Sequence, residues 1–390
     1  MTGTWPPADV SDRHAGFTRV AAMPFPVNAP FRVRADLVRL EGGAGAPPML
    51  LQSDAAYPAY ARIKRAHLDD TARPLTRVMD GIDAQRVIGA LAGALAAVAR
   101  SQPAVIGYAG PDLAGWRGDG SVREPAGQFL LHRAGLGLTL APGVRVRALA
   151  PGAEPLVERL AGLAPAHRAL AAFSLAVQED LALMGWLDWP GRGGADAAGA
   201  AAIAADAAGA GSTLAGAGSE ADTAAIGDAN VGLVALALSV VFPSGWDPAD
   251  KLGRALWAIH APVADGVPLR QASAALSRAM VDKGPFERFV WTLGTDPSLA
   301  RWPQSAQAPP PESPDLADLV FRCERQVTLG VPAFGASLFL IRIHVAPLLE
   351  VCSTRERRAR LVAALRSMSD DVVAYKNLQG LRERVLAAWD

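Results

Sequence analysis

Apolar residues in the second half of the chain recur with the short period that is typical of β-strands. This alternation is found in 319–329 and 336–345. Three further segments are also predicted to be strands: 231–242 is a continuous apolar run, 253–260 is short and mostly apolar, and 286–293 mixes aromatic residues with single charges. A helical segment at 269–283 interrupts the series, and the alternation of strand and helix that builds parallel sheets is missing. We therefore expect an α+β fold, in which an antiparallel sheet has helices packed on one side.

Helical spacing dominates the remaining parts of the chain. Residues 86–99 are rich in Ala, Leu and Val, and residues 154–187 carry apolar residues at helical spacing that Pro165 interrupts. Two charged segments, 354–367 and 375–389, are predicted to close the chain as helices. We expect these N-terminal and C-terminal helices to pack around the sheet.

The pattern divides the chain into five consecutive parts. They are an irregular N-terminal segment packed on the core (1–80), a helical part (81–190), an Ala/Gly-rich insertion (191–228), the sheet (229–350) and the C-terminal helices (351–390). The insertion consists almost entirely of Ala, Gly, Asp, Ser and Thr, which bury too little apolar area to offset the entropy lost on ordering. It is predicted to be a loose surface excursion, with a partly helical insertion as the alternative.

Composition restricts the functional classes. The 390 residues are 51% hydrophobic, and 38 Lys and Arg balance 38 Asp and Glu, so no long-range field attracts a polyanion. Nucleic-acid binding is therefore not expected. The two cysteines, Cys323 and Cys352, lack zinc-like spacing and are too few for a disulfide framework. The start of the chain has no signal-peptide pattern, and the longest apolar run is about half of the ~20 residues that span a membrane. We expect a cytoplasmic protein without a membrane anchor.

Most familiar catalytic motifs are missing from the sequence. It contains neither a GxSxG nucleophile elbow nor a GxxxxGK[ST] phosphate loop, and no GxGxxG follows a strand. The stretch FPSGWDPADKLGRALWAIHAPV, at 242–263, is more informative, because His260 emerges there at the end of an apolar segment. Neutral imidazole is a common axial ligand of haem iron, and a porphyrin face requires apolar surroundings. A satisfied core or turn histidine is the alternative.

Three buried charges also need an explanation. Arg325 falls on the apolar face of 319–329, which is costly unless a carboxylate of the protein, a substrate or a haem propionate pairs with it. A buried salt bridge is the structural interpretation. Glu179 and Asp180 interrupt an apolar sequence, so at least one of them is expected to be poorly hydrated and to act as a proton donor or a counter-ion. Arg342 and His344 share one face of 336–345, which solvent could simply cover.

The chain resembles the haem-dependent oxidative N-demethylase alpha-subunit family from about residue 25 to its C-terminus. The landmarks, in chain order, are QEDL at 178–181, the stretch at 242–263, Arg288 with Trp291, CERQVTLGVPAFGASLFLIRIHVAPL at 323–348, and Tyr375 with Lys376. The resemblance implies a PAS-like sheet that binds haem b and a small amine oxidised with O2 next to the iron. It also implies a separate NADPH-dependent reductase with flavin and a 2Fe-2S cluster, because no such motif is present here. A homo- or hetero-oligomer fits this arrangement.

The resemblance also assigns candidate roles to residues. His260 is the expected iron ligand, and the other expected cofactor contacts are Lys251, Trp257, Arg325 and Arg342. The expected catalytic residues are Glu179, Arg288 and Trp291. The mechanism is then an oxidation by haem and O2, with the protein supplying orientation and electrostatics. A haem-based gas or redox sensor and a scaffold without haem are the alternatives.

Two departures from the family pattern point to a divergent member. Val290 occupies the position at which the family usually has Asn between the arginine and the tryptophan. The turn before the last strand, residues 328–334, has no Arg or Lys, although the family usually has a basic turn there. If these positions line the cavity or the docking face, the substrate or the reductase has changed.

Overall fold

The structure is a computed structural model. It describes residues 23–32, 37–43, 45–110, 127–141, 143–189, 232–261, 267, 271–303 and 315–389. The Ala/Gly-rich insertion predicted at 191–228 lies outside the described residues. The described part combines helices with two antiparallel sheets, which confirms the α+β class.

The larger sheet has seven strands within the described residues, in the order β1-β9-β10-β11-β7-β8-β2, and every neighbouring pair is antiparallel. Its strands are β1 (Val38–Arg39), β2 (Arg77–Val78), β7 (Asp180–Gly185), β8 (Val234–Ser239), β9 (Phe286–Gly294), β10 (Val320–Val331) and β11 (Ala336–Pro347). The two long strands β10 and β11 form a hairpin at the centre, closed by the turn Pro332–Phe334. The alternation predicted at 319–329 and 336–345 is therefore confirmed.

A second, smaller sheet was not predicted. Its four strands are β3 (Ile106–Ala109), β4 (Gln128–Leu131), β5 (Leu136–Thr139) and β6 (Arg145–Ala148). It lies within the part expected to be helical, so that expectation was wrong for residues 106–148. Strands of four residues are too short for periodicity to distinguish them from loops.

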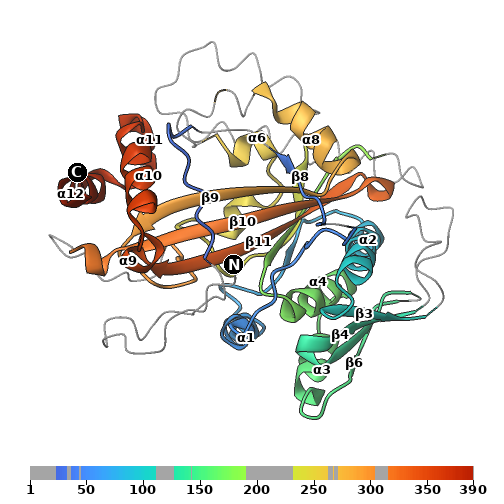
Figure 1. Cartoon of the computed structure of the whole chain (residues 1–390). Coiled ribbons are helices and arrows are strands. Elements are labelled where there is room, and N and C mark those ends of the chain that lie inside the picture. Colours follow the sequence, from blue (N-terminus) through green and yellow to red (C-terminus); the bar gives the residue numbers. More distant parts are fainter. Residues whose placement is uncertain are drawn as a thin grey trace.

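The helices lie on both faces of the large sheet, whereas we expected them on one (Figure 1). They are α1 (Tyr57–Ala66), α2 (Ala84–Ser101), α3 (Glu154–Ala161), α4 (Pro165–Ala176), α6 (Leu256–Ile259), α8 (Ser273–Asp282), α9 (Leu348–Val351), α10 (Arg355–Arg366), α11 (Asp370–Tyr375) and α12 (Gln379–Trp389). Side-chain caps fix several starts: Asp83 accepts from the amide of Gln85, and Thr354 accepts from that of Arg357.

Three predicted elements take another form. The helix expected over 154–187 ends at Ala176, and the apolar run that follows is the buried central strand β7. The strand expected at 253–260 is instead the single-turn helix α6, after an isolated bridge between Val234 and Ala255. The helix expected at 375–389 begins only at Gln379, as α12, and the separate short helix α11 precedes it, with Asn377 between them in the left-handed region at φ 52°. In each case the apolar composition fits both structures, and tertiary packing decides.

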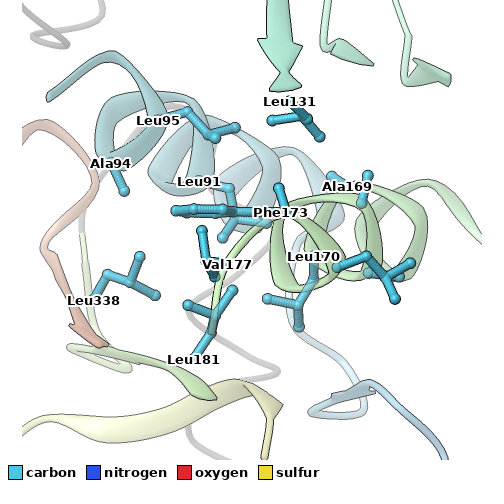
Figure 2. Packing of buried hydrophobic residues seen from close by; sticks show 14 of the residues in the cluster. Leu91, Ala94, Leu95, Leu131, Ala169, Leu170, Phe173, Val177, Leu181 and Leu338 are labelled. Atoms are coloured by element: carbon cyan, nitrogen blue, oxygen red, sulfur yellow. The ribbon is translucent and has the colours of Figure 1, made fainter. Parts of the chain in front are cut away.

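The main core lies between the sheet and the helices α2 and α4 (Figure 2). Phe173 of α4 packs between Leu91 of α2 and the sheet residues Leu181 and Leu338. The opposite face carries a smaller cluster, in which α6 and α8 contribute Leu256 and Met280. The helices on the two faces therefore hold the hairpin β10–β11 from both sides and leave part of one face available for a site.

Candidate functional site

A cavity of about 2060 Å³ lies over the sheet face that α6 and α8 partly cover. Its walls come from the strands β7 to β11, the helix α6, the N-terminal segment 26–32 and the C-terminal residues 372–387. The apolar part of the wall includes Ala182, Met184, Leu238, Val240, Phe339 and Ile341. Pockets for small ligands commonly measure about 300–1,000 Å³, so this cavity has room for a large cofactor together with a small substrate.

His260 is placed on the cavity wall by α6, which it terminates. Its Nδ1 lies 2.7 Å from the carbonyl oxygen of Leu256, one turn earlier. A carbonyl can only accept, so Nδ1 carries the proton and Nε2 keeps a free lone pair. Burial lowers the pKa of His260, and the nearby charges of Arg288 and Lys251 lower it further. The imidazole is therefore neutral at physiological pH and has the tautomer that a metal ligand needs.

Two cations accompany His260 on the cavity wall. Lys251 ends the short 3-10 helix Pro248–Lys251, and Arg288 lies on β9. Burial is the main cause that lowers the pKa of each, and the carboxylate of Glu324 partly opposes this for Arg288. Both side chains could bind the carboxylate groups of a ligand that reaches His260.

Glu324 contributes a carboxylate to the same cavity. The hydroxyl of Ser244 donates to its Oε1 at 2.6 Å, and the side-chain amide of Gln326 donates to its Oε2 at 3.0 Å. Both oxygens are thus held in place by neutral donors. Glu324 was not predicted from the sequence, although it stands on the polar face of its strand within the longest family landmark. This position on the polar face was the sequence feature from which Glu324 could have been predicted as a site residue.

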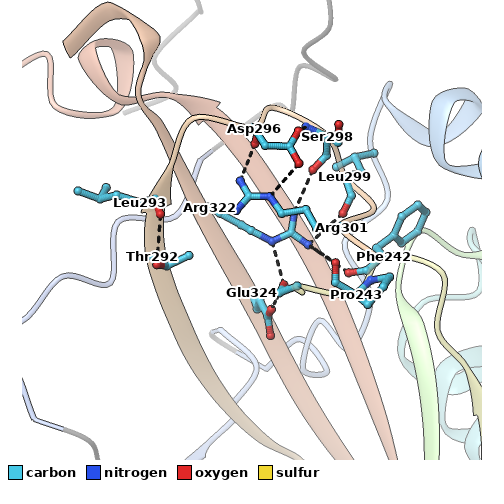
Figure 3. Close-up of polar contacts among 11 residues, drawn as sticks. Phe242, Pro243, Thr292, Leu293, Asp296, Ser298, Leu299, Arg301, Arg322 and Glu324 are labelled. Carbon is cyan, nitrogen blue, oxygen red and sulfur yellow. Dashed lines mark hydrogen bonds and ion pairs between the residues drawn. The ribbon is translucent and has the colours of Figure 1, made fainter. Parts of the chain in front are cut away.

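Arg322 fixes the wall behind Glu324 through contacts that use its whole guanidinium group. Nε donates to the hydroxyl of Ser244 at 2.9 Å, and the other nitrogens donate to the carbonyls of Phe242, Ser298 and Leu299 (Figure 3). Burial lowers the pKa of Arg322 to about 10, and the nearby Arg301 adds to this shift. Arg322 therefore positions the hydroxyl of Ser244 through the hydrogen bond from its Nε.

A family model matches the C-terminal part of the chain. Residues 220–386 match the family model described as haem-dependent oxidative N-demethylase, alpha subunit-like. The resemblance is confirmed over these residues. No curated protein matches the chain. The demethylase-like segment, residues 220–386, includes His260, Lys251, Arg288 and Glu324 of the cavity wall.

Among the residues that the structure describes, no group of three or more His, Cys, Asp or Glu side chains is arranged to hold a metal ion. A haem iron requires no such group, because the porphyrin supplies most of its ligands and one histidine can complete them. Among the same residues, no helix combines the length and the apolar character needed to cross a bilayer.

Arg325 and Arg342 of the demethylase-like segment lie on the sheet face away from the cavity. Nε of Arg325 binds Oε1 of Glu287 at 2.5 Å, and its other nitrogens donate to the carbonyls of Met49 and Leu50. Arg342 pairs with Asp54 at 3.1 Å. The carboxylates that these arginines need are therefore supplied by the protein. The prediction that solvent covers Arg342 and His344 was wrong. Both side chains are buried, and Arg342 contacts Asp54 while His344 contacts Gln52.

Glu179 and Asp180, which precede the demethylase-like segment, direct their side chains to different sides of the sheet. Oε1 of Glu179 accepts from the amide of Gln52 at 2.7 Å, away from the cavity. Asp180 lines the cavity, where its carboxylate accepts from the amides of Val241 and Phe242. Burial raises the pKa of Asp180 to about 6. Both carboxylates are buried, where the sequence led us to expect at least one, and Asp180 is the one that lines the cavity.

The two tryptophans with predicted roles differ in their positions. Trp291 lies on the cavity wall and stacks on Phe321, with ring centroids 5.6 Å apart. Trp257 is 42% exposed and does not contribute to the cavity wall. Of the residues predicted from the sequence, the structure therefore brings His260, Lys251 and Arg288 together on one face of the sheet, whereas Trp291 reaches the cavity wall from the other face of β9, beside Phe321 and Cys323.

Proposed function

We propose that this protein is a haem-dependent oxygenase that oxidises a small amine, using O2 and electrons from a separate reductase. The observation that carries the proposal is the neutral imidazole of His260, which lies on an apolar cavity wall near the cations Arg288 and Lys251. The antiparallel sheet with helices on both faces supports a PAS-like arrangement around this cavity. The family match adds support from the sequence side.

The residues of the cavity fit a haem group. Nε2 of His260 would bind the iron, because Nδ1 is occupied by the carbonyl of Leu256. The apolar wall would contact the porphyrin face, and Arg288 and Lys251 would hold the propionates. When bound, haem supplies the binding and reductive activation of O2. These groups are all inside one cavity, so no rearrangement of the sheet is needed.

Glu324 is our candidate for amine recognition. A protonated secondary amine donates to carboxylates, and Ser244 and Gln326 hold both carboxylate oxygens of Glu324 in fixed positions. Oxidation of an N-methyl group then gives formaldehyde and the smaller amine. The reaction consumes one O2, two electrons and two protons, with one oxygen atom released in formaldehyde and the other in water. The electrons would come from an NADPH-dependent flavin and 2Fe-2S reductase in the cytoplasm, in a hetero-oligomer or a transient complex.

Val290 supports an amine that differs from dimethylamine. It is the direct cross-strand neighbour of Glu324 on β9, and it lines the cavity. The family resemblance leads us to expect Asn there, so an apolar side chain stands where a polar amide would contact the substrate. An apolar substituent on the amine fits this environment better than a polar one. We therefore propose a secondary or tertiary N-methylamine with a larger alkyl group.

The test is turnover by protein produced with a haem precursor. A chemical reductant, O2 and a panel of N-methylamines should yield formaldehyde in a 1:1 ratio to the O2 consumed, beyond the yield of haem alone. Glu324→Gln is the control, since it keeps the size of the side chain and removes its charge. A protein that binds O2 without product formation would be a sensor, and one without a Soret band would be a scaffold. Either result would overturn the proposal.

A further inference from the structure

The helix α10 exposes an unusual density of positive charge. Its exposed side chains include four arginines and a single acid, and they are Arg355, Arg358, Arg360, Arg366 and Glu356. Three arginines, at 355, 357 and 358, stand in the first turn, where the helix dipole disfavours cations. In a chain of zero net charge, this local excess gives one end of the molecule a basic surface. We call the exposed arginines Arg355, Arg358 and Arg360 the basic surface.

Packing does not explain Arg355 and Arg360. Arg355 and Arg360 make no hydrogen bond, ion pair or ring contact with any residue that the structure describes. The apolar residues Leu361 and Leu365 of the same helix provide its contact with the core. Within the basic surface, Arg358 donates to the carbonyl of Cys352 and lies over the ring of Trp389. Arg355 and Arg360 contribute no such contact to the described fold, and Arg355 stands at the helix start, where the dipole disfavours a cation. Residues of this kind are common where a surface has a binding role.

An aromatic series connects this helix with the cavity. The guanidinium of Arg357 lies 5.1 Å from the ring centroid of Phe25, and the Phe25 ring lies 5.7 Å from that of Phe321. Phe321 stacks on Trp291 at 5.6 Å with an interplanar angle of 13°, and Trp291 lines the cavity. The rings thus form an unbroken series of contacts between the start of α10 and the proposed haem site.

We propose that the basic surface of α10 is the docking site for an acidic one-electron donor protein, and that Phe25, Phe321 and Trp291 lie on the electron path to the cavity. The proposal rests on the proposed function, because only a redox cofactor in the cavity requires such a donor. Each transfer oxidises the donor by one electron and reduces the cofactor by one electron, and no bond forms or breaks. Charge complementarity of this kind mainly sets the rate and specificity of docking.

The docking test uses reduced plant-type 2Fe-2S ferredoxin, a strongly acidic one-electron donor, as the probe. Its affinity is measured at low salt for the wild type and for Arg355→Glu/Arg360→Glu, with both haem-free and haem-loaded protein. The matched control, Arg62→Glu/Arg65→Glu, makes the same change in net charge on exposed positions of α1. We expect the α10 variant to bind about tenfold more weakly and the control to bind within about twofold of the wild type.

Several results would overturn the docking proposal. They are equal weakening in both variants, no change in the α10 variant, or no ferredoxin binding by the wild type at low salt. Binding of a short DNA duplex that is lost in the same variant would instead identify a general polyanion site. Because docking is also measured without haem, a failure to take up haem would contradict the proposed function and leave the docking result intact.

The electron path has its own test. Phe25 is only partly buried, so Phe25→Leu should fold normally and retain ferredoxin affinity. We expect stopped-flow reduction of the haem by docked ferredoxin to slow several-fold in this variant. An unchanged reduction rate at unchanged affinity would remove the aromatic series from the proposal.

Discussion

The hydroxyl of Ser244 donates a hydrogen bond of 2.6 Å to Oε1 of Glu324, although the two residues are 80 positions apart in the chain. The same hydroxyl accepts from Nε of Arg322 at 2.9 Å. A bridge between Ser244 and Arg301 anchors the turn that carries it. The turn after β8 thus sets the orientation of a carboxylate on β10, and this orientation is needed if Glu324 recognises the substrate.

Replacement of Ser244 by alanine should impair substrate positioning without loss of haem. Glu324 would lose one of its two donors and become free to rotate, so we expect KM for the amine to rise about tenfold, as one charge-assisted hydrogen bond is lost. Steady-state formaldehyde production measures this. Ser298→Ala is the matched control, because only the backbone carbonyl of Ser298 contacts Arg322. Equal KM values in the two variants would contradict the role of Ser244.

Val290→Asn should shift the substrate preference toward dimethylamine. The new amide would stand opposite Glu324 and be poorly compatible with an apolar substituent. We expect the ratio of kcat/KM for dimethylamine to that for a larger N-methylamine to increase about tenfold. Competition between the two amines, followed by product analysis, gives the ratio directly. A ratio that stays within twofold of the wild-type value would show that Val290 does not set specificity.

Lys64 should be among the most important residues for stability. It is fully buried, and its ammonium group donates to the carbonyls of Ser174 and Val177 at 3.0 and 3.1 Å and to that of Glu179. Lys64→Met leaves these acceptors unpaired and removes the positive charge nearest Asp180, so we expect a loss of about 3–5 kcal/mol in the free energy of unfolding. Denaturant titration measures the loss. Exposed Lys283→Met should change it by less than about 0.5 kcal/mol, and a similar small effect at Lys64 would contradict the prediction.

His344 should make the protein sensitive to acid. Burial lowers the pKa of His344 to about 3, and the neighbouring Arg342 and Arg325 contribute to the shift. Between about pH 3 and pH 6.5, the unfolded chain binds a proton at this histidine that the folded protein does not bind. The free energy of unfolding therefore rises with pH over this range and decreases as the pH falls. Compared with His344→Gln, the wild type should lose about 1.4 kcal/mol more per pH unit over this range. Parallel slopes for the two proteins would show that His344 is protonated without cost.

The strands of the second half were predictable because their side chains alternate between two environments. Val327 and Leu329 face the α2–α4 core, while Glu324 and Gln326 face the cavity. The strand β7 could not be recognised in the same way. Both of its faces are buried, so its run of Leu, Ala and Met is as compatible with the end of a helix as with a central strand.

The site was predictable only in part. His260 stands out at the end of an apolar segment, and the family resemblance points to Arg288 and Trp291; the structure places all three on the cavity wall. Which face of the sheet a charge occupies relative to the cavity depends on packing that is remote in sequence. Arg325 therefore looked like a cofactor contact, although Glu287 and the carbonyls of the N-terminal segment satisfy it. Glu324, one residue earlier, faces the cavity instead.

The absorption spectrum of His260→Ala, after expression with a haem precursor, tests whether His260 is the iron ligand. We expect the wild type to be purified with one haem per chain and a histidine-ligated Soret band. His260→Ala should lose this stoichiometric haem or show a changed axial spectrum, while His132→Ala, at an exposed position away from the cavity, should match the wild type. An unchanged haem content and spectrum in His260→Ala would contradict the assignment of His260 as the iron ligand.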